Sequence, residues 1–269
     1  MASTLPSPKK WSGHGMPYIP LDDLSGKLIV VEGTDGVGRS TQVALLREWL
    51  EVQGFSVVET GWTRSKLLGP AISEAKAGHS LNRLTFGLMY AADFADRLEN
   101  EIIPALRAGS IVLSDRYIYT AWARDTVRGL DPAWVRALFG FAVVPDLVFY
   151  LKIDIENLVP RVLRARRLNY WEAGVDLGLG WDLYDCFVKY QTRLLAAYDQ
   201  MEQEYGFSTL DARVPPDQIQ KAMRREIEKR LFAHRKQNHA SDTARAAAEP
   251  ARHAGPGGGG PAGTAPPSP

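Results

Sequence analysis

The run Leu28-Ile29-Val30-Val31, followed at once by Glu32-Gly33-Thr34-Asp35-Gly36-Val37-Gly38-Arg39-Ser40-Thr41, decides the fold of this chain. A short β-branched run predicts a buried strand, and the glycines after it allow the backbone to curl around a phosphate chain with its N–H groups directed inward. The helix expected from Ser40 adds the positive end of its dipole at the same point. The cation at Arg39 and the hydroxyl at Ser40 complete a loop that predicts nucleotide binding, with the hydroxyl reaching Mg²⁺.

One position in this loop departs from the usual pattern, because Arg39 stands where a lysine is expected. Arginine keeps the charge, but its planar fork is bulkier and grips two oxygens, whereas lysine presents a compact point charge. The alternative is a glycine-rich turn that binds no nucleotide. Strand, loop and helix follow one another in the order that the motif requires, which favours nucleotide binding.

Outward from the loop, short apolar runs alternate with stretches of helical spacing. Five runs predict strands at residues 27–31, 56–59, 110–114, 147–153 and 207–210, and helices are expected at 40–53, at 95–108 and from Asp131-Pro132. Strands that alternate with helices pair in parallel through right-handed crossovers. We therefore expect an α/β fold, a three-layer P-loop NTPase sandwich with a five-stranded parallel sheet.

The composition changes sharply at both ends of the chain. Residues 240–269 contain no Leu, Ile, Val, Met or aromatic residue, so we expect a disordered Ala/Gly/Pro-rich tail over residues 234–269. Residues 1–25 are rich in Pro and Ser, but Trp11 and Leu21 lie among them. They predict a mostly irregular arm whose later part docks on a single domain, residues 26–233.

Charge and cysteine content exclude several classes of function. Lys and Arg total 32 against 31 Asp and Glu, so no bulk basic excess favours a nucleic-acid polymer or an anionic membrane as partner. A lone cysteine, Cys186, excludes an intramolecular disulfide, and no Cys/His cluster predicts structural zinc. No apolar run approaches the roughly 20 residues of a membrane helix, and the N-terminus has no signal-like segment. We expect a cytoplasmic protein.

Several segments resemble the motifs of one family, the thymidylate kinases. The pattern Glu-Gly-x-Asp-Gly-x-Gly-x-Ser-Thr at residues 32–41 is similar to their first motif, and Asp115-Arg116-Tyr117 resembles their second, with the spacing continuing to Thr120 and Ala123. The resemblance covers nearly all of residues 26–233. It implies a kinase domain that transfers the γ-phosphate of ATP to dTMP or a related nucleoside monophosphate with Mg²⁺, a role in nucleotide biosynthesis, and a homodimer.

The resemblance and the chemistry of phosphoryl transfer together assign the donor side. Transfer between two nucleotides requires two anions held in line with their charge neutralised, so no covalent nucleophile is expected. We expect Asp35, Arg39, Asp115 and Arg164 to be catalytic, and Ser40 and Asp115 to bind Mg²⁺. The predicted ATP-binding residues are Gly33, Thr34, Asp35, Gly36, Val37, Gly38, Arg39, Ser40 and Thr41.

On the acceptor side, the resemblance assigns Arg64 and Arg116 to the acceptor phosphate. Arg116 follows the end of a strand and can hold a phosphate bidentately, the alternative being a surface salt bridge. Tyr90 is the candidate for stacking on the base, the alternative being a core aromatic. The Arg-rich residues 161–167 predict a lid over the phosphates, the alternative being a solvated helix face.

Four residues depart from the family pattern in the acceptor pocket and lid. Phe94 stands where an arginine reads the thymine edge, and Arg124-Asp125 stand where an aromatic and a Gln or Thr are common. Tyr170 stands at the position of a lid arginine. The exchange to Phe94 removes a hydrogen-bond donor from the predicted pocket, and Asp125 adds a hydrogen-bond acceptor that would suit an exocyclic amino group. A cytosine or adenine nucleotide therefore stays open as the phosphate-accepting substrate. The predicted acceptor site comprises Arg64, Tyr90, Phe94, Arg116, Thr120, Arg124 and Asp125.

A second function also stays open, a nucleotide-binding module of kinase fold with little or no turnover. The Arg39 exchange and the altered pocket favour it. Retention of Ser40, Asp115, Arg116 and the Arg-rich segment favours an ATP-dependent enzyme, because a mere binder need not keep acceptor-side groups.

Overall fold

A computed structural model describes residues 8–79 and 81–232 of the chain. The described residues up to Ile227 form one compact unit. The predicted tail, residues 234–269, lies outside the described residues. Within the described part of the chain, no helix combines the length and apolar character needed to cross a membrane.

Five parallel strands form one sheet in the order β2-β3-β1-β4-β5, which confirms the predicted fold class. The strands are β1 (Lys27–Glu32), β2 (Val57–Gly61), β3 (Ile111–Asp115), β4 (Leu147–Lys152) and β5 (Ser208–Asp211). β1 lies at the centre, paired with β3 on one side and β4 on the other. Where strand order reverses in this way, a crevice forms at the carboxyl ends of the strands and takes the ligand.

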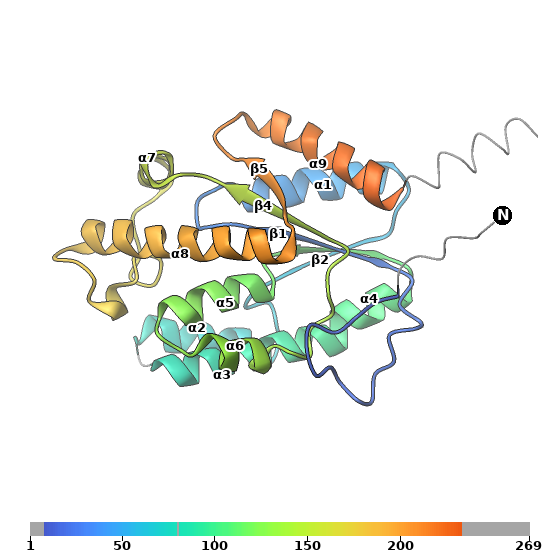
Figure 1. Ribbon diagram of the computed structural model, residues 1–269, viewed down its shortest axis with the longest axis horizontal. Helices are drawn as coiled ribbons and strands as arrows, with labels where there is room; N and C mark the ends of the chain where they lie inside the picture. Colours follow the sequence, from blue (N-terminus) through green and yellow to red (C-terminus); the bar gives the residue numbers. More distant parts are fainter. Residues whose placement is uncertain (1–7, 80, 233–269) are drawn as a thin grey trace, which may run out of the picture. The chain divides into compact units, whose positions relative to one another are not determined.

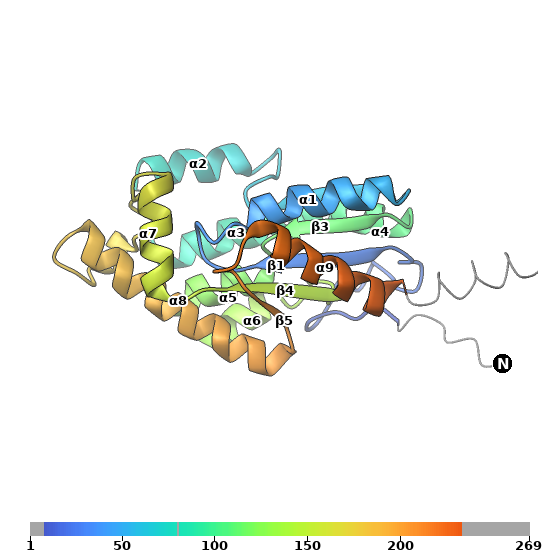
Figure 2. The same cartoon turned by 90° about the horizontal axis from the view of Figure 1, so that it is seen from above.

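Helices cover both faces of the sheet (Figure 1). α1 lies on one face beside α9, whose Gln220 donates to the backbone oxygen of Gln42. α4, α5 and α6 lie on the opposite face. The helices are α1 (Arg39–Val52), α2 (Gly69–Ala77), α3 (Arg83–Arg97), α4 (Ile103–Arg107), α5 (Ile118–Val127), α6 (Pro132–Leu138), α7 (Ile155–Ala165), α8 (Leu183–Tyr205) and α9 (Pro216–Leu231). Figure 2 shows α2 and α7 at the end of the sheet where β1 leads into α1.

The helix predicted at residues 95–108 is three consecutive pieces. The end of α3 passes into a π-helical turn, η1 (Leu98–Ile102), and then into α4. Pro104 explains the break, because proline lacks the N–H of the regular ladder and its ring crowds the carbonyl four residues earlier. The helix predicted after Asp131 is α6, and Asp131 caps it by accepting from the backbone N of Trp134 at 2.7 Å.

The N-terminal segment contacts the domain over much of its described length. Trp11 forms a β-bridge with Val143, and Met16 and Leu24 are buried in the core that α3, α5 and α8 also build. The backbone N of Gly26 donates to the oxygen of Leu106 at 2.8 Å. This anchoring fixes the entry into β1, the strand that leads to the phosphate loop.

Candidate functional site

The phosphate loop joins β1 to α1, as the sequence predicts. Gly33, Gly36 and Gly38 have φ angles of 141°, 82° and 102°, a region that side chains disfavour. A Cβ atom on Gly36 would lie 2.5 Å from Cγ2 of Val162 on α7. The loop therefore requires glycine at this position for two reasons, backbone conformation and close approach of a neighbouring helix.

Arg39 lies inside the loop and is 8% exposed. Its Nε donates to Oδ1 of Asp115 at 2.8 Å, and Nη1 donates to the backbone oxygen of Gly33 at 2.6 Å. Nη1 also donates to the backbone oxygen of Thr34. The guanidinium thus connects the loop to the end of β3.

Ser40 and Asp115 bring two oxygen ligands together, since the Ser40 hydroxyl donates to Oδ2 of Asp115 at 2.8 Å. Among the described residues, no group of three or more His, Cys, Asp or Glu could hold a metal alone. This donor set fits Mg²⁺, which binds through one or two protein oxygens and otherwise keeps water and substrate phosphates as ligands.

Arg116 joins the acceptor side to the phosphate loop. Its guanidinium forms an ion pair with Asp35 of the loop, and its backbone has a positive φ of 74°. Burial lowers the pKa of Arg116 to about 10, and the positive charge of Arg124 adds to the effect. The side chain remains a cation at neutral pH, held in a strained backbone conformation of the kind that occurs at functional sites.

Glu32, at the end of β1, hydrogen-bonds to the segment that follows Arg116. Its fully buried carboxylate accepts from the backbone N of Tyr117 at 2.7 Å, from the Thr120 hydroxyl at 2.6 Å and from the Tyr198 hydroxyl at 3.0 Å. Burial raises the pKa of Glu32. The network holds the backbone that follows Arg116, a role that the sequence analysis missed although Glu32 belongs to the first motif.

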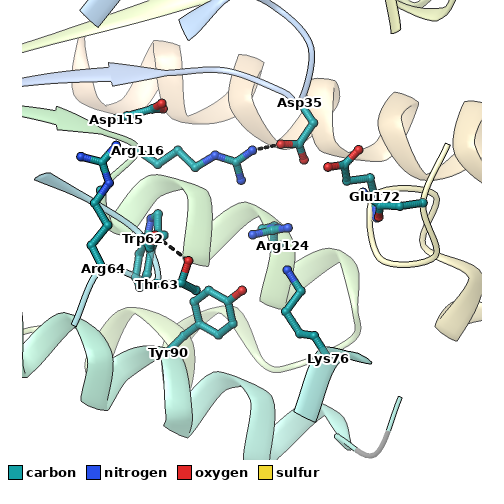
Figure 3. A pocket seen from close by; sticks show the side chains of 12 residues that line it. Asp35, Trp62, Thr63, Arg64, Lys76, Tyr90, Asp115, Arg116, Arg124 and Glu172 are labelled. Carbon is teal, nitrogen blue, oxygen red and sulfur yellow. Dashed lines mark hydrogen bonds and ion pairs between the residues drawn. The ribbon is translucent and has the colours of Figure 1, made fainter. Parts of the chain in front are cut away.

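A pocket of about 200 Å³ opens beside the loop, at the carboxyl ends of β1, β2 and β3 (Figure 3). Cations, anions and two aromatic rings share its walls. The lining comprises Asp35, Gly61, Trp62, Thr63, Arg64, Lys76, Tyr90, Asp115, Arg116, Arg124, Asn169 and Glu172. Four predicted acceptor residues therefore come together here, namely Arg64, Tyr90, Arg116 and Arg124.

Three other predicted acceptor residues do not line this pocket as far as the described residues define it. Phe94 is fully buried against Trp62 and Tyr117 in the core, because α3 turns it toward the sheet. Thr120 is 2% exposed, and its hydroxyl donates to the carboxylate of Glu32. Asp125 is 4% exposed and faces α3, where a Cβ on Gly87 would lie 3.3 Å from its Oδ2.

Sequence reasoning missed several lining residues, above all Lys76 on α2. Burial lowers the pKa of Lys76 to about 8, and the neighbouring charge of Arg124 adds to this. The charge of Glu172 acts in the opposite direction. The positions of Glu172 and Asn169 depend on how the segment after α7 folds back, which no local pattern reveals.

The predicted lid, residues 161–167, lies near the phosphate loop and is absent from this lining as far as the described residues define it. Arg161 donates to the backbone oxygen of Val37 at 3.2 Å, next to the phosphate loop. Arg164, predicted to be catalytic, is exposed and lines a neighbouring pocket with Arg161 and Arg213. Tyr170 stacks on His79 with ring centroids 3.9 Å apart, so the segment after α7 contacts the end of α2.

Comparison with known proteins decides the family. A family model for thymidylate kinase matches residues 31–178. The chain belongs to the thymidylate kinase family. As a member of it, the protein is an ATP-dependent phosphotransferase, which confirms the predicted class of enzyme and does not favour the module without turnover.

Individual thymidylate kinases cover different shares of this chain. A probable thymidylate kinase 2 from Saccharolobus solfataricus is 40% identical over 199 residues, which are 73% of this chain and 93% of the relative. A probable thymidylate kinase from Thermococcus kodakarensis is 38% identical over 150 residues, 52% of this chain and 73% of the relative. A thymidylate kinase from Clavibacter sepedonicus is 44% identical over 138 residues, 49% of this chain and 65% of the relative.

Proposed function

We propose that this protein transfers the γ-phosphate of ATP to dTMP. The observation that carries the proposal is the ion pair between Arg116 of the acceptor pocket and Asp35 of the phosphate loop. Phosphoryl transfer requires donor and acceptor phosphates within reach of each other, and this pair joins the two binding regions directly.

The donor phosphates would bind in the loop of residues 33–38, at the N-terminus of α1. Backbone N–H groups and the helix dipole stabilise anions there. Arg39 would neutralise charge that develops on the transferred group. Ser40 and Asp115 would hold Mg²⁺, which when bound supplies charge neutralisation between the phosphates.

The acceptor would bind in the pocket beside the loop. Arg64 and Arg116 are the cations next to Asp35 and Asp115, which suits them to the monophosphate. Tyr90 and Trp62, with ring centroids 5.5 Å apart, offer aromatic surface for the base. Arg161 and Arg164 remain the lid candidates, and the homodimer and cytoplasmic location remain implications of the family.

A cytosine or adenine acceptor is not favoured. The relatives are named for thymidylate, and Asp125, which suggested an amino group, is buried away from the pocket. Measuring ADP release with Mg-ATP and a panel of dTMP, dUMP, dCMP and dAMP tests this directly. We expect dTMP to give the highest kcat/KM; a clear preference for dCMP or dAMP would overturn the proposal.

A further inference from the structure

Lys76 occupies an unusual position for a lysine. It lies in the last turn of α2, yet its ammonium is directed into the acceptor pocket, toward Arg124 and beside the ring of Tyr90 (Figure 3). No hydrogen bond or ion pair of this ammonium occurs among the residues that the structure describes. A half-buried cation next to a second cation is unfavourable, so a ligand group that accepts hydrogen bonds would relieve the repulsion between Lys76 and Arg124.

The two cations offer donors and no acceptor. A lysine ammonium has three N–H donors and an arginine guanidinium five, and neither accepts a hydrogen bond. Of the lining carboxylates, Glu172 acts on the charge of Lys76, and Arg166 already pairs with Glu172. An edge of the base that faces Lys76 and Arg124 is therefore bound best when it presents a hydrogen-bond acceptor to them.

Lys76 is the cation that α2 contributes to the pocket lining. The resemblance implies an arginine at position 94 that reads the thymine edge, and here that position holds Phe94, buried in the core. The side of the pocket formed by α3 therefore contributes the ring of Tyr90 and no cation at that position. Lys76 approaches the same ring from α2, so its ammonium is the cation beside Tyr90 on that side of the pocket.

We propose that Lys76 is a specificity-determining residue that donates a hydrogen bond to the carbonyl oxygen at C4 of the acceptor base, so that the site selects thymine or uracil over cytosine. Cytosine bears an amino group at C4. An amino group that faces Lys76 and Arg124 is itself a hydrogen-bond donor, so it could not accept a hydrogen bond from either cation. A site built to hydrogen-bond one group discriminates against its replacement, because buried polar groups are left unpaired. The inference rests on the proposed function, since it assigns a role within the acceptor site.

The test measures kcat and KM for dTMP and dCMP in the wild type and in Lys76→Met, Lys76→Arg and Lys76→Gln. We expect Lys76→Met to raise KM for dTMP roughly tenfold with a smaller change in kcat, and to lower the ratio of kcat/KM for dTMP over dCMP by a similar factor. Lys76→Arg should restore the ratio. Lys66→Met, exposed and outside the pocket lining, is the matched control.

Lys76→Gln makes the test independent of how well the methionine variant folds. Its amide can accept as well as donate, so we expect higher kcat/KM for dCMP than in the wild type. Equal losses for both nucleotides in Lys76→Met, with no gain for dCMP in Lys76→Gln, would overturn the inference while leaving the proposed function intact. A wild type without activity on dTMP would overturn both.

Discussion

Arg39 and Asp115 are joined by a hydrogen bond of 2.8 Å from Nε to Oδ1, which links the first turn of α1 to the end of β3. The other oxygen of the same carboxylate accepts from Ser40 at 2.8 Å. One aspartate therefore positions both the cation of the phosphate loop and the hydroxyl suited to Mg²⁺. The exchange of lysine for arginine is accommodated by this carboxylate and by the carbonyl oxygens of the loop.

The first prediction concerns this cation. We expect Arg39→Lys to keep or raise kcat, because lysine places the same charge as a compact donor. Arg39→Met should lower kcat by roughly 100-fold or more, since the charge that stabilises the transferring phosphate is lost. Steady-state kinetics with Mg-ATP and dTMP measure both, with Arg47→Met, on the exposed face of α1, as control. An Arg39→Met variant as active as the wild type would show that this residue has no part in transfer.

The second prediction concerns the metal. Ser40→Ala removes one proposed oxygen ligand, so we expect the Mg²⁺ concentration for half-maximal activity to rise roughly tenfold. Calorimetry should show the same weakening for Mg-ADP while binding of ADP without metal changes little. Thr192→Ala, which removes a hydroxyl from α8 outside the site, is the control. Unchanged Mg²⁺ dependence in Ser40→Ala would contradict the assignment.

The third prediction is a pH dependence of acceptor binding. Burial and the nearby charge of Arg124 lower the pKa of Lys76 to about 8, and Arg128 and Glu172 act on it in opposite directions. The charged form is the better donor, so KM for dTMP should be lowest below pH 8 and rise above it. Lys76→Arg should flatten this rise up to pH 9, because arginine stays protonated. A rise of the same size and midpoint in that variant would assign the titration to another group.

The fourth prediction concerns stability. Burial raises the pKa of Asp125 to about 6, partly offset by Arg128, and its Oδ2 has no hydrogen-bond partner among the described residues. The folded state therefore favours the protonated carboxyl: this contribution is full below about pH 4 and is lost as pH rises through 6. Asp125→Asn should stabilise the fold by about 1–3 kcal/mol at pH 7.5 and by little at pH 4.5.

Thermal unfolding at both pH values measures the effect of Asp125→Asn. Asp22→Asn, a substitution at an exposed aspartate, is the control and should change the unfolding temperature little at either pH. A destabilised Asp125→Asn at pH 7.5 would mean that the ionised carboxylate has a stabilising partner after all.

The strands and the loop were predictable because their signals are local. Leu28–Val31 form a continuous buried run, and each observed strand lies within two residues of its predicted range. The glycine spacing of the loop reflects backbone conformation that only a few residues allow. The break at Pro104 was missed because the apolar spacing continues through the π-helical turn.

The acceptor pocket was less predictable because it depends on which way helices turn. The family resemblance suggested Phe94 and Asp125 as acceptor residues, whereas the structure buries Phe94 in the core and Asp125 beside Gly87 of α3. Lys76 reaches the pocket from α2, and the presence of a lysine at this position does not by itself predict that it lines the pocket. A charged residue near the end of an amphipathic helix usually faces water. Only the packing of α2 against α3 reveals the exception.

The most direct test of the account is product analysis of the wild-type protein incubated with Mg-ATP and dTMP. Chromatography of the nucleotides should show dTDP and ADP appearing in equal amounts, with neither formed when Mg²⁺ is removed by chelation. ADP formation without dTDP, or no turnover of either nucleotide, would contradict the claim that Asp35 and Arg116 bring a triphosphate and a thymidine monophosphate together.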